Sequence, residues 1–456
     1  MIHSVAKYAR AAAAAATIRG RAISVRSSSV RYSTPLRWIH GEISVPNANH
    51  VAIQMVIYAL SHARSQKSGE SYAQGMLVLE QCLGNQPNDD QASHDSKATV
   101  LLAMSDLLYE RFHLSLSLSL SLCYLVMESL VFLFLFCFVL WVYSGNSSEA
   151  IERLKQVMSL TLSSLSIRVV AVEALVGLLI QLGQDDASLI VADEFLEMVK
   201  ERGLENLQDV AATANTIKGL AVLVKGNTES AESLFGGLEN NEMCKGNVAL
   251  SYGEFLHATG NFEKAKEMYQ KAIQGAADTK ESMSSCNMNL KAVSLAATFA
   301  LGQLESHFGN FGDAEETLTS ALTSAEEHYG HNHPKVGVIL TGVALMYRNK
   351  AKRERSSSIL IQEGLFRRAL ELMKAPPLDS EEIINMETQE VMALARGGYA
   401  ELLLIQENRK SEGEKMKAWA ESAWRNRRVS LSEALAPSSD PLDKVAIIDA
   451  RTTRLL

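Results

Sequence analysis

Three histidines in the last third of the 456-residue chain are the residues best suited to bind a metal ion. His328, His331 and His333 follow two consecutive glutamates, and imidazole nitrogens and carboxylate oxygens are common zinc ligands. Pro334 comes next, and proline favours the first position of a helix. This order of residues is typical of a turn between two helices. We therefore expect a structural turn here, with no metal and no cofactor.

Other residue patterns give no sign of catalysis. The sequence contains no Gly-rich phosphate-binding loop, no Gly-x-Ser-x-Gly motif and no His-Glu-x-x-His motif. Its five cysteines are too far apart for a zinc or redox motif, and we expect reduced, mostly buried thiols; they are Cys82, Cys123, Cys137, Cys244 and Cys286. The sequence therefore predicts that the protein is not an enzyme.

The composition favours helices as the elements that position these residues. Apolar residues make up 47% of the chain, and prolines number only 8. Ala, Leu, Glu and Ser predominate, and the first three are strong helix formers. We predict an all-α fold with an ample hydrophobic core.

The first 40 residues differ in charge from the rest of the chain. They contain seven Lys and Arg residues and no acidic residue, and they are rich in Ala and Ser. Residues 1–40 therefore look like a mitochondrial transit peptide, with processing near Tyr32; a chloroplast transit peptide and a disordered basic tail are the alternatives. Without these seven charges the formal net charge changes from −8 to −15, so no nucleic-acid partner is expected.

A pattern of glycines and small residues recurs three times along the chain. In each copy two glycines lie seven residues apart and Asn follows the second glycine. A small residue lies five positions after the second glycine, and a large apolar residue lies nine positions after the same glycine. The three copies comprise Gly219, Gly226, Ala231 and Phe235; Gly253, Gly260, Ala265, Tyr269 and Ala272; and Gly302, Gly309, Ala314, Leu318 and Ala321.

This pattern resembles the tetratricopeptide repeat (TPR). Gly226 and Gly260 are 34 residues apart, which is the TPR period. We expect Gly253 to face Ala265 across a helix pair, and Gly260 to end the first helix in the left-handed conformation. The resemblance implies a right-handed superhelical solenoid of antiparallel helix pairs.

The resemblance also suggests a repeat subtype and the extent of the array. Residues 325–336 are similar to the linker of kinesin-light-chain-type repeats, and the chain resembles the plant-type mitochondrial TPR-like superfamily. TPR-like helices are expected over 50–111 and a TPR solenoid over 145–435, followed by a C-terminal tail over 436–456. The basic run from Lys350 to Arg355 predicts a solvated, charged excursion, with a nuclear or RNA-binding role as the alternative.

An apolar insert, residues 112–144, interrupts the repeat pattern. Joining Arg111 directly to Gly145 restores a repeat, with Ala150 five positions after the glycine. The 33 residues correspond to 99 nucleotides, and alternating Leu and Ser is what a CT tract encodes, so one interpretation is a retained intron. The other is a transmembrane helix, since the block is long enough to span a bilayer, although Glu128 would then lie inside the membrane.

The resemblance to TPR proteins implies a function and a binding surface. Such proteins usually bind a protein or peptide ligand in a concave groove lined by the first helix of each pair. The expected groove residues are Thr216, Leu220, Glu254, His257, Gln303, Ser306 and His307. We therefore expect a non-enzymatic protein-binding scaffold or adaptor acting in mitochondria. The alternative is a membrane-anchored respiratory-complex assembly factor with a TPR domain.

Overall fold

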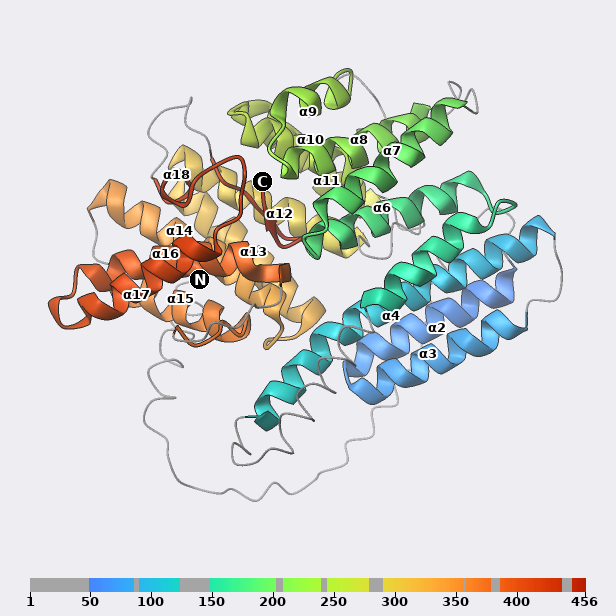
Figure 1. The fold of residues 1–456 in the computed structure, drawn as a ribbon, viewed down its shortest axis with the longest axis horizontal. Coiled ribbons are helices and arrows are strands. Elements are labelled where there is room, and N and C mark those ends of the chain that lie inside the picture. The colour runs from blue at the N-terminus through green and yellow to red at the C-terminus, as the bar shows by residue number, and fades with distance from the viewer. Residues whose placement is uncertain are drawn as a thin grey trace.

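The computed structural model describes residues 49–85, 90–123, 147–201, 208–238, 244–278, 290–355, 358–378, 386–436 and 445–456. Within these ranges the fold is all-α apart from one two-stranded sheet, as the composition predicts. Figure 1 shows the helices arranged as an array that curves from α2 to α17. The predicted transit peptide, residues 1–40, lies outside the described residues.

The helices form a succession of antiparallel neighbours. In chain order they are α2 (His50–Gln66), α3 (Gly69–Gly84), α4 (Gln91–Cys123), a helix at 147–159, α6 (Leu165–Gln181), α7 (Asp185–Glu201), α8 (Gln208–Val224), α9 (Thr228–Phe235), α10 (Gly246–Ala258), α11 (Phe262–Asp278), α12 (Leu290–Phe308), α13 (Phe311–Tyr329), α14 (Pro334–Glu354), α15 (Ile359–Leu372), η2 (Met386–Thr388), α16 (Gln389–Leu404), η3 (Glu407–Arg409), α17 (Lys410–Ala423) and α18 (Leu431–Ala434).

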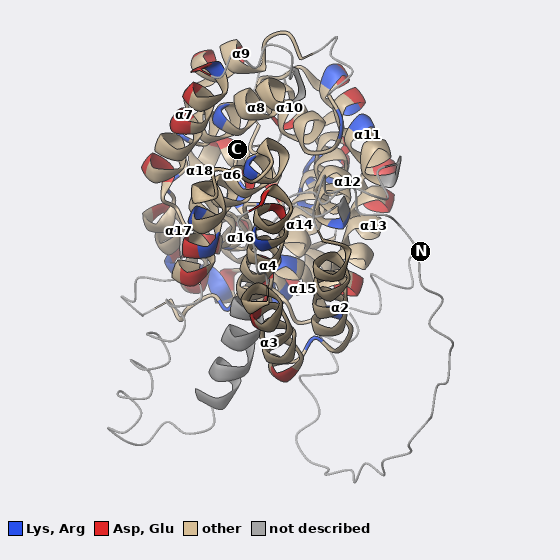
Figure 2. Ribbon diagram, turned by 90° about the vertical axis from the view of Figure 1, so that its right-hand side faces the viewer, with Lys and Arg blue, Asp and Glu red and all other residues tan. Residues whose placement is uncertain are grey.

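Each pair consists of an inner and an outer helix. The helices pack as the pairs α2–α3, α6–α7, α8–α9, α10–α11, α12–α13, α14–α15 and α16–α17, and the first helix of each later pair also contacts the first helix of the next. Charged residues gather on outer helices such as α7 and α11, whereas α8 and α10 are nearly free of them (Figure 2). This stacking of helix pairs is a TPR-like solenoid.

The Gly-Asn dipeptides form the turns inside three of these pairs. Gly226, Gly260 and Gly309 have φ of +85°, +82° and +89°, the left-handed conformation that glycine adopts without strain. The Asn261 amide donates to the Leu256 carbonyl at 2.7 Å, which satisfies a carbonyl at the end of α10. The two other turns repeat this bond, so the predicted helix ends are confirmed.

The first glycine of each repeat allows a large side chain to approach the inner helix. A Cβ placed on Gly253 would lie 2.8 Å from Tyr269 Cε1, which is closer than real side chains approach. We expected Gly253 to face Ala265, and the atoms nearest to this Cβ belong to Tyr269 and Met268. The other two first glycines likewise face the large apolar residue of their own repeat, Phe235 or Leu318.

We expect Gly253→Ala to destabilise the protein by about 1–3 kcal/mol, because the added methyl group overpacks the contact with Tyr269. Gly364 on α15 is a matched control, since nothing lies within 4 Å of a Cβ added there. Gly364→Ala should be neutral or stabilise the protein by up to about 1 kcal/mol through helix propensity. Chemical denaturation of the two variants measures both effects, and equal stabilities would contradict this packing.

The helix α4 continues beyond Arg111 into the predicted insert and ends at Cys123. Residues 124–146 lie outside the described residues, and so does most of the insert. The helix at 147–159 follows, and its residues Ala150, Leu154 and Val157 are fully buried. Among the helices that the structure describes, none is long and apolar enough to cross a membrane.

Removing residues 112–144 should leave a folded, helical protein, because Ala150 and Leu154 already occupy the buried repeat positions that the joined sequence requires. We expect this deletion variant to remain in the supernatant, since it lacks an apolar block that promotes aggregation. Circular dichroism and sedimentation measure the outcome. If the natural transcript always retains the 99 nucleotides and the protein resists carbonate extraction, the retained-intron interpretation is wrong.

The basic run from Lys350 to Arg355 is mostly helical. The helix α14 continues through Glu354, so the predicted excursion is replaced by about one and a half further turns of helix. Lys352 Nζ contacts Glu401 at 2.8 Å, and Arg353 Nη2 donates to the His307 carbonyl at 3.3 Å. These side chains bind neighbouring helices of the solenoid.

Candidate functional site

The predicted groove residues lie on the inner helices α8, α10 and α12, but most of them are buried. Thr216 is 2% exposed and its hydroxyl donates to the Ala212 carbonyl of its own helix. The other predicted positions are also buried, apart from a half-buried His307; they are Leu220, Glu254, His257, Gln303 and Ser306. Two of them, Glu254 and Gln303, are covered by a segment from the end of the chain.

This covering segment, residues 445–456, is named the hairpin segment. Strands β1 (Ile448–Asp449) and β2 (Arg454–Leu455) pair antiparallel. The Asp449 carboxylate accepts a hydrogen bond from the Arg451 amide at 2.7 Å, an interaction that stabilises the tight turn between the strands. Residues 436–456 were predicted as a tail, and within them the hairpin segment is buried in the solenoid.

The inner face is defined as the surfaces of α6, α7, α10, α12, α14 and α16, with η2, that contact the hairpin segment. Its first polar site surrounds Arg451. The guanidinium donates to Asn247 Oδ1 at 2.5 Å and to Ser251 Oγ at 2.9 Å, and it also contacts Glu254 Oε2. Three residues of α10 therefore bind one arginine side chain.

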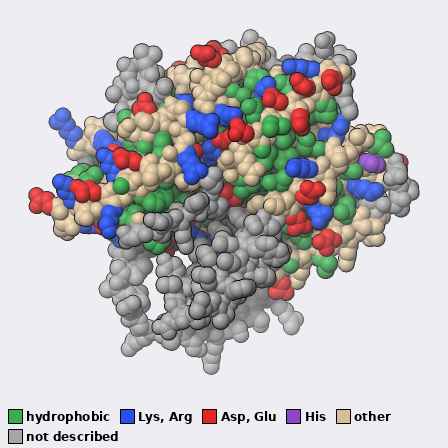
Figure 3. All heavy atoms as spheres, viewed as in Figure 1, with side chains coloured by type: hydrophobic (Ala, Val, Ile, Leu, Met, Phe, Trp, Pro, Cys, Tyr) green, Lys and Arg blue, Asp and Glu red, His purple; other side chains and the backbone are tan. Residues whose placement is uncertain are grey.

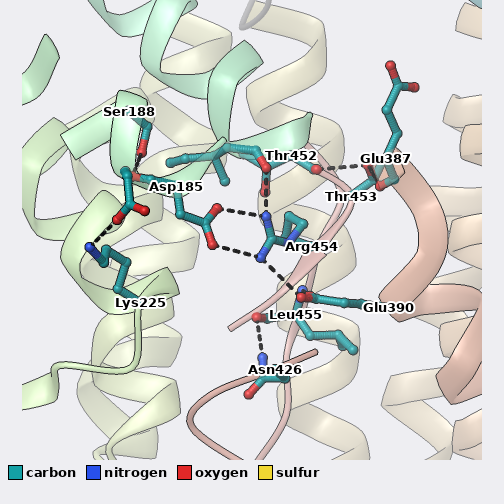
Figure 4. Close-up of polar contacts among 12 residues, drawn as sticks. Asp185, Ser188, Lys225, Glu387, Glu390, Asn426, Thr452, Thr453, Arg454 and Leu455 are labelled. Atoms are coloured by element: carbon teal, nitrogen blue, oxygen red, sulfur yellow. Dashed lines mark hydrogen bonds and ion pairs between the residues drawn. The ribbon is translucent and has the colours of Figure 1, made fainter. Parts of the chain in front are cut away.

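The second polar site surrounds Arg454, three residues along the hairpin segment. Figure 4 shows its guanidinium between Asp185 and Glu390. The distances are 2.9 Å to Asp185 Oδ1 and 3.0 Å to Glu390 Oε1, and the Ile180 carbonyl accepts a further bond at 2.8 Å. Carboxylates of α7 and α16, from opposite parts of the solenoid, thus bind the same guanidinium.

The inner face also binds the backbone of the hairpin segment. The Gln303 side chain donates to the Ile448 carbonyl at 3.0 Å and accepts from the Ile448 amide at 2.9 Å. Glu390 accepts from the Leu455 amide at 3.0 Å. The Gln303 amide thus satisfies both backbone polar groups of Ile448, as a neighbouring strand would.

Burial changes the acidity of several inner-face groups. Burial raises the pKa of Glu254 well above its usual value, although Arg451 opposes this shift. One guanidinium, that of Arg451, contacts two buried carboxyls, those of Glu254 and Asp449. Burial also raises the pKa of Glu387 to about 8 and lowers that of Lys335 to about 8.

Two predicted groove histidines form a buried chain of hydrogen bonds behind the hairpin segment. His257 Nδ1 lies 3.1 Å from the Tyr269 hydroxyl, and its Nε2 lies 2.8 Å from His307 Nδ1. Burial lowers the pKa of His257 well below its usual value and lowers that of His307 to about 4. Both rings are therefore neutral at pH 7, and they hold α10 against α12.

The histidines near residue 330 form a structural turn. His333 caps α14 by accepting a hydrogen bond from the Lys335 amide at 3.1 Å, and Pro334 is the first residue of that helix. His331 is largely exposed and lies 3.2 Å from Glu326. In the part of the chain that the structure describes, no group of three His, Cys, Asp or Glu residues is arranged to hold a metal ion.

The end of α2 and helix α4, near the start of the solenoid, contact α13 and α14 beside this turn. Lys67 Nζ donates to the Glu327 carbonyl at 2.6 Å, and Lys335 Nζ lies 5.6 Å from the centre of the Tyr109 ring. A small cavity remains between them, lined in part by Arg64 and His328. Sequence reasoning missed this contact, because no local pattern links residues so far apart.

No protein-family model matches the chain, and no curated protein matches it. Among solved structures the chain is similar to BtubC (BKLC) from P. vanneervenii, with 12% identity and a TM-score of 0.36, over 52% of this chain and 89% of that one. It is also similar to a chain of Naa15/Naa10 bound to HypK-THB, with 15% identity and a TM-score of 0.18, over 82% of this chain and 63% of that one. Similarities this low carry no functional argument.

Proposed function

We propose that this chain is a non-enzymatic scaffold that binds a protein segment on its inner face and acts in mitochondria. The observation that supports this function is the hairpin segment itself. Side chains of the inner helices bind both its backbone and its side chains. Glu254 and Gln303, expected from the repeat register to line a groove, are among the residues that do so.

The surface charges support a protein partner over a nucleic acid. Figure 3 shows basic and acidic side chains interspersed over the described part of one face. Binding to phosphates favours a clustered basic surface, because each neutralised phosphate needs a nearby Lys or Arg. The described side chains of this face are not arranged in that way.

Site-specific photo-crosslinking in mitochondria tests the scaffold function. A photoreactive amino acid at Asn247, a half-buried inner-face position, should crosslink to a protein partner. The matched control is Ser320, an exposed residue on the outer helix α13. Crosslinks from both positions alike, or from Ser320 alone, would place the partner elsewhere and contradict the proposal.

The mitochondrial location rests on residues 1–40 and has its own test. A fluorescent reporter fused to these residues should enter mitochondria, because an Arg-rich segment without acidic residues is typical of an import signal. A variant with all seven Lys and Arg residues replaced by Gln is the control and should stay in the cytosol. Reporter found only in plastids would favour the chloroplast alternative.

A further inference from the structure

The two arginines of the hairpin segment enter two separate acidic sites. Arg451 and Arg454 are 4% and 7% exposed, so both guanidinium groups have lost nearly all contact with water. A buried charge is tolerated only when it is paired and hydrogen-bonded. The inner face provides this compensation with carboxylates from three helices, namely Glu254 of α10, Asp185 of α7 and Glu390 of α16.

The geometry of both sites suits arginine rather than lysine. Arg454 donates from two nitrogens to two carboxylates and one carbonyl. Its Nη1 binds the Ile180 carbonyl and Asp185, whereas its Nη2 binds Glu390. Arg451 similarly binds an amide oxygen, a hydroxyl and a carboxylate. A planar guanidinium has five donors in a fixed fork, whereas a lysine ammonium has three donors at one point and cannot reach all of these acceptors.

The backbone contacts place the two arginines in register. Gln303 binds Ile448 on one strand, and Glu390 binds Leu455 on the other. Lys335 Nζ donates to the Arg451 carbonyl in the turn at 3.3 Å. All three contacts are noncovalent.

We propose that the inner face is a binding site for a partner peptide that carries two arginines three residues apart in a tight turn, and that the hairpin segment is an internal copy of this ligand. This inference rests on the proposed scaffold function and specifies its ligand. The hairpin segment and the partner compete for Glu254, Asp185 and Glu390. The intact chain therefore binds the partner weakly until the hairpin segment leaves.

The strength of this competition follows from tethering. A segment joined by a short linker has an effective concentration of about a millimolar or more at its own site. An external peptide binds only the fraction of molecules whose site is open, so its apparent affinity falls in proportion to that fraction. Weakening the hairpin segment should thus increase the affinity for an external peptide.

The experiment uses the full-length chain and a fluorescent peptide with the sequence of residues 445–456. We expect the variant Arg451→Ala/Arg454→Ala to bind this peptide about tenfold or more tightly than the unmodified chain, because its own segment no longer fills the arginine sites. A matched peptide with lysine at both arginine positions should bind about tenfold or more weakly. Fluorescence anisotropy measures both affinities, and circular dichroism confirms that each variant is folded.

Changes on the inner face complete the test. Adding Asp185→Asn and Glu254→Gln to the double variant should abolish peptide binding, whereas adding Glu316→Gln, on the exposed side of α13, should not. A chain that ends at residue 436 is a second receptor without the hairpin segment. Equal binding of the arginine and lysine peptides, or no binding to a folded double variant, overturns the inference.

The outcomes separate this inference from the scaffold function. If a partner crosslinks at Asn247 but the arginine peptide does not bind, the ligand chemistry is wrong and the scaffold function remains. If the peptide binds but no protein crosslinks at Asn247 even in the Arg451→Ala/Arg454→Ala chain, whose site is open, the scaffold function fails. A concentration-dependent dimer, with the hairpin segment in a second copy of the chain, would contradict the placement of this segment in its own solenoid.

Discussion

Replacing Arg451 by Met should lower the free energy of unfolding by about 3–5 kcal/mol, among the largest effects of any single substitution in this protein. The change removes the guanidinium that binds Glu254 and Asp449, and both carboxyls are 1% exposed. Two like charges then remain in an environment without water, and each disfavours ionisation of the other. Urea denaturation at pH 7 measures the loss.

Two controls assign this loss to the buried ion pairs. Arg451→Met combined with Glu254→Gln should be less destabilised than Arg451→Met alone, since one orphaned carboxyl becomes neutral. Arg367→Met removes an exposed ion pair with Glu363 and should change stability by less than about 1 kcal/mol. If the double variant is no more stable than Arg451→Met, the contact with Glu254 is not the source of the loss.

The second large effect concerns pH. The pKa of His307 is lowered to about 4 in the folded chain and that of His257 is lowered well below its usual value, both mainly by burial. Between pH 6.5 and pH 4 the unfolded chain therefore binds protons that the folded chain does not. The contribution of these groups to stability is present above pH 6.5 and is lost as the pH falls, by up to about 1.4 kcal/mol per pH unit for each histidine.

Buried carboxyls with a raised pKa, such as Glu387, change stability with pH in the opposite direction. The prediction is therefore tested as the difference in unfolding free energy between a histidine variant and the unmodified chain. His307→Asn should destabilise the protein at pH 7.5, because it removes the neutral ring that shares a hydrogen bond with His257. This penalty should shrink as the pH falls to 5. The exposed His331 provides the control, because His331→Gln should cost less stability at pH 7.5 than His307→Asn. A penalty for His307→Asn that does not change with pH would contradict this account.

The helix turns could be predicted from the sequence because their determinants are local. Gly260 and Asn261 form their turn with carbonyls only a few residues away, so the dipeptide alone indicates it. The contacts of the first glycine in each repeat could also have been predicted from the sequence. Gly219, Gly253 and Gly302 each face the large residue sixteen positions later, and this spacing repeats in the sequence.

The occupant of the inner face could not be predicted in this way. Gln303 and Ile448 are 145 residues apart, and nothing near either residue indicates the other. The register suggested Glu254 and Gln303 as groove positions, and both contact the hairpin segment, but it did not suggest Asp185 or Glu390. These two residues lie at the start of their helices, where an acidic residue is also expected simply because it interacts favourably with the helix dipole.

The hairpin segment has a consequence for folding during synthesis. Arg454 binds the Ile180 carbonyl, 274 residues earlier in the chain, so its contacts form only after the helices that receive them have been made. Domains emerge and fold from the N-terminal side at about 5–20 residues per second. For part of that time the nascent solenoid has helices α6 to α12 but lacks the arginines that neutralise Asp185 and Glu254. Among the described elements, the hairpin segment is therefore the last that can pack into the solenoid.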